Sequence, residues 1–221
     1  MNVLAFDTTS RFLDIALETG HGSHVRFEEI GLRHSEALVP ALIAVCRDAG
    51  ITLQEVSLLA CSRGPGSFTG LRIGMATAKG IAAGLGIPVV SVPAPEIYVE
   101  AALAAADALT PDTILLPAID ARKKRFYTAV YRNGERHTPL LDIGAAELYS
   151  RFLSSCERVL ICGPDGELLA GQLGEYLPGN RVSLLPFSPA APTLAAAAVR
   201  HLSAGETDAL TQGPEYIRGT T

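Results

Sequence analysis

Several features that would place the chain in a membrane or in a secreted protein are missing from its 221 residues. The longest unbroken apolar runs, such as residues 194–199, are far shorter than the roughly 20 residues that a membrane span needs. Residues 1–7 contain no basic segment and reach an acid at Asp7, which is typical of a first strand and not of a signal peptide. The sequence therefore predicts a cytoplasmic protein without a membrane partner.

Motifs for metal binding and nucleophilic catalysis are also absent. The four cysteines form no C-x-x-C pair, which fits buried thiols in a reducing compartment. The five histidines form neither H-E-x-x-H nor a Cys/His cluster, so no metal site is expected. No G-x-S-x-G elbow surrounds Ser67, because Pro65 and Thr69 stand where its glycines belong. We therefore expect no metal ligands and no acyl-enzyme chemistry.

Charged residues make up only 19% of the chain and the net charge is −5, which argues against a protein that coats nucleic acid by itself. Residues 118–137 depart from this balance, with six basic residues against two acidic ones. Four of the basic residues are consecutive: Arg122, Lys123, Lys124 and Arg125. They are a candidate contact for phosphates or for an acidic partner surface, and the alternative is a solvated hairpin tip.

What is present is an order of elements that occurs twice. Apolar alternation, helical periodicity and turn residues predict three strands, a helix, a strand, a helix, a strand and a helix in the first copy, at residues 3–6, 13–17, 25–30, 35–48, 56–62, 70–85, 88–92 and 95–109. The second copy is predicted to have strands and helices at residues 114–119, 126–131, 136–141, 145–153, 159–162, 167–173, 182–185 and 193–202.

An ungapped alignment supports a duplication. Placing Asp7 on Asp120 brings residues 15–17 onto residues 128–130. We expect two lobes, residues 1–109 and a shortened lobe 110–221, with the layout of the actin/Hsp70/sugar-kinase (ASKHA) ATPases and with the two aspartates facing each other across a shallow cleft. That layout gives a fold class and no function by itself. The alternative is one α/β domain with two unrelated β-meanders.

Two short segments suggest chemistry. The first is the hairpin tip Asp7, Thr8, Thr9 and Ser10, where this fold class places a phosphate- and Mg²⁺-binding carboxylate, with Asp120 at the equivalent tip. The second is the glycine loop at residues 64–70, in which Gly64, Gly66 and Ser67 precede a helix whose free N–H groups can hold an anion. The structural alternatives are that each aspartate caps its turn and that the glycines allow close packing.

Small residues mark the helix after this loop. Gly70, Gly74, Ala78 and Ala82 recur every four residues and so share one face, while Ala76, Gly80 and Gly84 form a second stripe. Glycine in a helix costs roughly 1 kcal/mol relative to alanine, so close approach of another backbone is the expected compensation. We expect the first stripe to form a subunit interface with Leu38, Leu42 and Val45 of the preceding helix. The alternative is that both stripes are internal.

Six segments together resemble the TsaB (YeaZ) family. They are LAFDTTS at 4–10, HSEALVP at 34–40, GPGSFTGLRIG at 64–74, AKG at 78–80, DAR at 120–122 and PEYIR at 214–218. The resemblance extends over the whole chain, and the 64–74 segment is the most specific part of it. It is shared with the catalytic relative TsaD.

The resemblance implies a non-catalytic bacterial subunit that partners and activates TsaD, together with the ATPase TsaE. The complex transfers a threonylcarbamoyl group to the adenine beside the anticodon of tRNAs that read ANN codons. TsaD holds its metal with an H-x-x-x-H pair, and here Ala94 and Tyr98 stand at those positions. No catalytic residue is therefore expected in this chain.

The same resemblance implies no cofactor of the chain's own, although ATP or ADP could bind at an interface with partners. It also implies a homodimer when the chain is alone, and contact with tRNA only within the complex. A stand-alone small ATPase or kinase that uses Asp7, the glycine loop and Asp120 is the alternative function.

Overall fold

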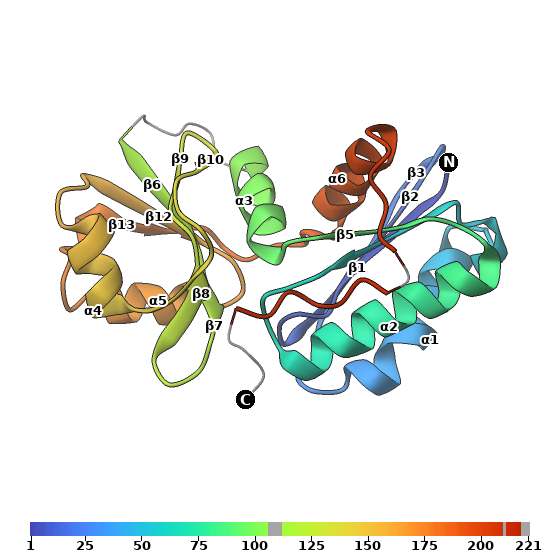
Figure 1. Cartoon of the computed structure of the whole chain (residues 1–221), viewed down its shortest axis with the longest axis horizontal. Helices are drawn as coiled ribbons and strands as arrows, with labels where there is room; N and C mark the ends of the chain where they lie inside the picture. The colour runs from blue at the N-terminus through green and yellow to red at the C-terminus, as the bar shows by residue number, and fades with distance from the viewer. Residues whose placement is uncertain (106–111, 210, 218–221) are drawn as a thin grey trace. The chain divides into compact units, whose positions relative to one another are not determined.

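The computed structural model describes residues 1–105, 112–209 and 211–217, and it confirms the predicted α/β class (Figure 1). The chain forms two compact units. One comprises Met1–Ile97 and Pro189–Glu215, and the other comprises Tyr98–Ser188 with Tyr216 and Ile217. The predicted boundary at 109/110, the end of the helix predicted at 95–109 and Arg218 lie outside the described residues. The prediction that each lobe is one continuous stretch of the chain is wrong, because the last helix returns to the first unit.

The first unit is built on a five-stranded sheet with the order β3-β2-β1-β4-β5. Its strands are β1 (Val3–Asp7), β2 (Phe12–Thr19), β3 (Gly22–Glu29), β4 (Leu58–Ser62) and β5 (Val89–Val92). The first three are antiparallel and the last two are parallel to β1. Both β1 and β4 are buried along their whole length, as expected for central strands with helices on both faces.

Helices cover both faces of this sheet (Figure 1). The helical elements of the first unit are α1 (His34–Asp48), η1 (Leu53–Glu55), α2 (Phe68–Leu85) and α6 (Ala191–Ser203). α1 and α2 pack together on one face, and α6 contacts β1, β2, β4 and β5 from the other. α3 (Ala94–Ala105) spans the division between the two units. Among the described residues, no helix is long and apolar enough to cross a bilayer.

The second unit has a five-stranded sheet, β10-β9-β6-β12-β13, and a three-stranded sheet, β11-β8-β7. The strands are β6 (Thr113–Pro117), β7 (Ile119–Asp120), β8 (Arg125–Thr128), β9 (Tyr131–Arg132), β10 (Glu135–Arg136), β11 (Leu141–Gly144), β12 (Arg158–Cys162) and β13 (Val182–Leu184). The helical elements are α4 (Ala145–Leu148), the π-helix η2 (Tyr149–Leu153), α5 (Gly166–Leu173) and the 3₁₀ turn η3 (Gly179–Arg181).

The single strand predicted at residues 136–141 is wrong. Asn133 and Gly134 have φ values of 52° and 80° and form the tight turn of a short β9–β10 hairpin. Pro139 then follows, and its missing N–H prevents the ladder from continuing. Pairing resumes at Leu141, opposite Thr128 of β8.

The predicted repetition of the fold appears in the sheet topology. In both five-stranded sheets, the central strand has two antiparallel strands on one side and two parallel strands on the other. The ungapped alignment, however, is wrong by one residue. Asp7 pairs with Asp14, whereas Asp120 pairs with Phe126, so the second turn is one residue shorter. A gap in that turn is needed to superpose the second strands.

Candidate functional site

The hairpin tip after β1 and the glycine loop before α2 lie directly against each other in the first unit. The Ser67 N–H donates to the Thr9 carbonyl at 2.7 Å, and the Thr8 hydroxyl donates to the Gly70 carbonyl at 2.8 Å. Thr8 and Thr9 are 2% and 1% exposed. The sequence therefore correctly singled out two segments that meet in space.

Glycine is required at this contact. A Cβ atom at Gly66 would lie 2.5 Å from the Thr9 carbonyl oxygen, closer than real Cβ atoms approach. Cβ atoms at Gly70 and Gly74 would collide with the Thr8 carbonyl oxygen and the Thr8 hydroxyl, respectively. These three glycines allow the backbone of the loop and of α2 to pack against the hairpin tip.

The N-terminus of α2 is closed by its own chain. Ser67 is the N-cap residue, and its hydroxyl accepts the Gly70 N–H at 3.3 Å. The Ser67 N–H is already donated to Thr9. Two of the N–H groups that an anion would use are thus engaged internally, and the side of the loop facing the hairpin tip is filled by Thr8 and Thr9. The geometry favours the close-packing interpretation of the glycine loop.

Asp7 and Asp120 play the same local role in their separate units. One carboxylate oxygen of Asp7 accepts the Thr9 N–H at 2.8 Å, and one of Asp120 accepts the Arg122 N–H at 2.7 Å. Each aspartate thus binds the backbone two residues further on, which stabilises its turn. That the two carboxylates face each other across a cleft stays a prediction.

Asp14 is a buried carboxylate that sequence reasoning missed. It is 2% exposed, lies beside Asp7 on β2, and its Oδ2 atom accepts the Ala190 and Ala191 N–H groups at 2.6 and 3.0 Å. Burial raises the pKa of Asp14 to about 7, and the neighbouring Asp7 charge adds to this shift, while the two backbone N–H groups oppose it. The sequence did contain a signal for a buried carboxylate, because Asp14 stands between Leu13 and Ile15 in an apolar strand.

The seven residues predicted to form the subunit interface lie inside the first unit, so that assignment is corrected. Leu38 and Leu42 of α1 are 1% and 0% exposed. The stripe on α2 is buried as well, against the sheet and the hairpin tip, because its small residues permit close packing there. All seven side chains or glycines are buried: Leu38, Leu42, Val45, Gly70, Gly74, Ala78 and Ala82.

The opposite faces of the same two helices are exposed and apolar. Val39 and Ile43 of α1 are 44% and 53% exposed. On α2, Ala76, Gly80 and Gly84 are exposed, and Cβ atoms at Gly80 and Gly84 would have no described atom within 4 Å. The fold itself therefore gives no reason for glycine at these two positions. We call Val39, Ile43, Ala76, Gly80 and Gly84 the outer helix face.

The basic segment forms the turn between β7 and β8. Arg122, Lys123 and Lys124 are exposed, as predicted for a hairpin tip. Arg125 differs, because its guanidinium pairs with the Asp142 carboxylate at 2.7 Å. Arg122 also pairs with Asp120, at 3.4 Å. Two of the four cations therefore have acidic partners within the chain.

Ala94 and Tyr98, which the resemblance places at the H-x-x-x-H positions, are both buried on α3. The Ala94 N–H donates to the Gly64 carbonyl at 2.8 Å, and the Tyr98 ring packs edge-on against Phe187. Among the described residues, no group of three or more His, Cys, Asp or Glu side chains could hold a metal ion. These positions carry packing contacts.

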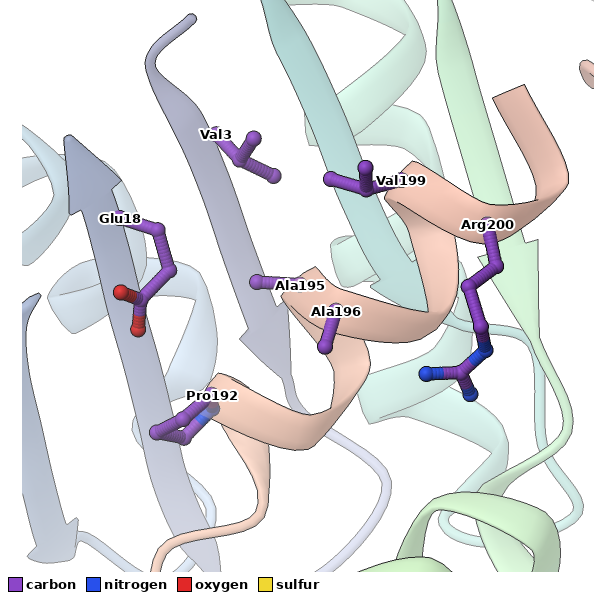
Figure 2. Close-up of a pocket in the computed structure, with 7 residues that line it drawn as sticks. All are labelled: Val3, Glu18, Pro192, Ala195, Ala196, Val199 and Arg200. Atoms are coloured by element: carbon purple, nitrogen blue, oxygen red, sulfur yellow. The ribbon is translucent and has the colours of Figure 1, made fainter. Parts of the chain in front are cut away.

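A groove of about 540 Å³ lies between α6 and the sheet of the first unit (Figure 2). Figure 2 shows Glu18 and Arg200 on either side of an apolar floor. The residues that line it are Val3, Glu18, Pro192, Ala195, Ala196, Val199 and Arg200. Val3 begins β1 whereas Asp7 ends it, so the groove lies away from the carboxyl ends of the parallel strands, where α/β sheets usually bind ligands.

The described part of the C-terminal PEYIR segment lies along the end of β4. The Glu215 N–H donates to the Arg63 carbonyl at 2.8 Å, and the two side chains form an ion pair at 3.4 Å. The Arg63 guanidinium also donates to the Ser91 carbonyl of β5 at 3.0 Å. Glu215 thus fastens this segment to the strands beside the glycine loop.

Known proteins share both the sequence and the fold. A family model described as "TsaD: tRNA N6-adenosine threonylcarbamoyltransferase" matches residues 26–167. The tRNA threonylcarbamoyladenosine biosynthesis protein TsaB of Escherichia coli is 33% identical over 135 residues, which cover 61% of this chain and 57% of that protein. TsaB of Bacillus subtilis is 31% identical over 175 residues, 76% of this chain and 73% of that protein.

The match thus spans little more than half the length of the Escherichia coli relative, and close to three quarters of the Bacillus subtilis one.

The structure of YeaZ from Pseudomonas aeruginosa superposes with a TM-score of 0.77 and 26% identity, covering 98% of this chain and 99% of that one. The sheet order, the glycine loop against its hairpin tip, and these similarities lead to one assignment. The chain belongs to the TsaB (YeaZ) family and has its duplicated ASKHA-type fold.

Proposed function

We propose that the chain is a non-catalytic subunit required for threonylcarbamoyladenosine formation beside the anticodon of tRNAs that read ANN codons. In this proposal it binds and activates TsaD, together with TsaE. The names of the relatives support the pathway. The observation that carries the proposed role is the glycine loop, because its Ser67 and Gly70 N–H groups are already donated to Thr9 and Ser67 and so are not free to hold a phosphate.

The absence of catalysis rests on two positions. Ala94 and Tyr98 stand where the resemblance places the metal ligands of TsaD, and neither offers an imidazole. Both are buried and used in packing. The chemistry is therefore assigned to the partner, and this chain needs a surface that reaches it.

The outer helix face is the surface that fits a partner. Glycine inside a helix costs about 1 kcal/mol relative to alanine. At Gly80 and Gly84 no contact with another described part of the chain offsets that cost. A second helix that packs closely against α2 would offset it, with Val39 and Ile43 supplying the larger apolar contacts.

TsaD is the proposed partner because its family model matches this chain over residues 26–167. That range includes α1 and α2, so a related chain presents a related pair of helices. Two such pairs can form a four-helix contact, either between this chain and TsaD or between two copies of this chain. We therefore expect a homodimer when the chain is alone and a heterodimer when TsaD is present.

Replacing Ile43 with aspartate tests this surface. Ile43→Asp should convert the dimer to a monomer in sedimentation and should abolish co-purification with TsaD, because a charge would be buried in an apolar interface. The matched control is Leu168→Asp on α5, since Leu168 is 46% exposed and Ile43 is 53% exposed. Retained association in Ile43→Asp, with an unchanged circular dichroism spectrum, would place the interface elsewhere.

The alternative function, a stand-alone small ATPase or kinase, would use Asp7, the glycine loop and Asp120. Steady-state ATP hydrolysis by the purified chain separates the two functions. We expect the purified wild-type chain and the Asp7→Asn variant to hydrolyse ATP at the same background rate. Turnover that disappears in this variant would support the enzyme, and nucleotide that binds only in the presence of TsaD and TsaE would belong to their shared interface.

A further inference from the structure

The turn between β7 and β8 has a backbone conformation that its residues disfavour. Arg122, Lys123 and Lys124 have φ values of 67°, 54° and 59°, so three successive residues with side chains adopt the left-handed conformation. Glycine, asparagine and aspartate are the residues that usually tolerate it. Such strain persists only where the surroundings enforce it, and it is concentrated at functional positions.

Acidic side chains hold this turn in place. The Asp120 carboxylate accepts the Arg122 N–H, and the Asp120 N–H donates to the Asp165 carboxylate at 2.8 Å. At the other end, the Arg125 N–H donates to the Arg122 carbonyl at 3.1 Å, while its guanidinium pairs with Asp142. The strained backbone is therefore fixed from both sides.

The turn presents two cations without acidic partners. Arg122 and Arg125 pair with Asp120 and Asp142, whereas Lys123 and Lys124 form no ion pair within the described part of the chain. Both lysines are exposed at the apex of the turn. Their two positive charges stand out on a protein with a net charge of −5.

We propose that Lys123 and Lys124 bind the phosphate backbone of RNA when the chain is part of the modifying complex. This inference rests on the proposed function, which supplies tRNA as the substrate. Lysine ammonium groups are flexible point charges that neutralise phosphates without reading bases. The neighbouring Phe126 is fully buried, so its ring cannot stack on a base. The contact is therefore independent of base sequence and sensitive to salt.

The test uses the complex of this chain with TsaD and TsaE, and a full-length tRNA. The dissociation constant is measured at several salt concentrations for the wild type, for Lys123→Gln/Lys124→Gln and for the control Arg158→Gln. Arg158 is exposed and forms no ion pair among the described residues. A plot of the logarithm of the dissociation constant against the logarithm of the salt concentration gives the salt slope. Each lost phosphate contact should reduce the magnitude of this slope by about 1. We expect a decrease of about 1 to 2 for the double variant and none for Arg158→Gln.

A second variant separates a binding turn from a merely strained one. Lys124→Gly places the residue that best tolerates positive φ at the third strained position, and it removes one charge. We expect a higher melting temperature together with weaker tRNA binding. A higher melting temperature with unchanged affinity and salt slope would overturn the proposal.

Two other results would also overturn it. If the double variant loses association with TsaD in the absence of RNA, the turn binds a protein surface. If the double variant assembles and binds tRNA with the wild-type salt slope, the turn makes no phosphate contact, while the proposed function stands. Failure of the wild-type chain to associate with TsaD would instead reject the proposed function, and this inference with it.

Discussion

Asp14→Asn should change how the stability of the chain depends on pH. The Asp14 carboxyl is buried, and its pKa is raised from 3.8 to about 7. In the unfolded chain the group ionises near 3.8, so between that value and about 7 the folded state binds one proton more than the unfolded state. The free energy of unfolding must then fall as pH rises through this window, and the loss is complete above pH 7.

The size of the effect follows from the shift. Each pKa unit corresponds to about 1.4 kcal/mol, so the contribution of Asp14 should fall by about 3 kcal/mol between pH 5 and pH 8. No discount for solvent screening applies, because the residue is 2% exposed. Asparagine at this position does not titrate. Its side-chain carbonyl can still accept the Ala190 and Ala191 N–H groups. Its NH₂ group would occupy the position of Oδ1, which has no hydrogen-bond partner among the described residues.

Urea denaturation of both proteins at pH 5, 6, 7 and 8 measures this difference. Subtracting wild type from variant cancels the other titrating groups, and the stability of Asp14→Asn relative to wild type should rise by about 3 kcal/mol across the series. Asp48→Asn removes a carboxylate whose side chain is 64% exposed, and it is the control for the loss of a surface charge. A flat difference for Asp14→Asn, or one that falls with pH, would refute the raised pKa.

Two predictions concern the glycine loop and its helix. Both changes are made in the Ile43→Asp background, which is expected to be monomeric. There, Gly70→Ala should destabilise the chain by about 1–3 kcal/mol in urea denaturation, because the new methyl group collides with Thr8. Gly80→Ala should stabilise it by about 1 kcal/mol, because no partner helix packs against α2 in the monomer. Equal effects at the two positions would mean that the close contact with Thr8 does not explain Gly70. Ser67→Ala should lower the free energy of unfolding by about 1 kcal/mol, because α2 loses its N-cap. Ser67→Thr should restore most of this stability. An unchanged stability of Ser67→Ala would contradict the capping role.

The repeated fold could be predicted from the sequence because its elements carry strong local signals. Alternating apolar strands and the turn residues at Asn133–Gly134 gave the element types, and the order of elements implied two similar sheets. The one-residue gap between the copies could not be predicted, since it lies in a turn where few residues are alike. The register of the strands determines it.

The domain boundary could not be predicted because it depends on contacts between distant parts of the chain. The helical pattern of α6 follows the second unit in the sequence, yet α6 packs on the first sheet and Asp14 binds its N-terminus. Asp14 is separated from Ala190 by most of the chain. Local periodicity predicts a helix there and contains no information about which sheet it will cover.

The candidate site was predicted in its segments but not in all of its contacts. The sequence singled out the hairpin tip and the glycine loop, which do meet. Periodicity also found two stripes of small residues on α2, but both stripes satisfy the same spacing rule. Only the position of Thr8 against Gly70 and Gly74 shows which stripe is internal.

The most direct test of the non-catalytic role is reconstituted tRNA modification with threonylcarbamoyl-adenylate as the donor. We expect modified adenosine only when this chain, TsaD and TsaE are combined, and none from the chain alone. Ile43→Asp should reduce the product to background, while Leu168→Asp should leave it unchanged. Modification by the chain alone, or full modification by TsaD and TsaE without it, would contradict the account.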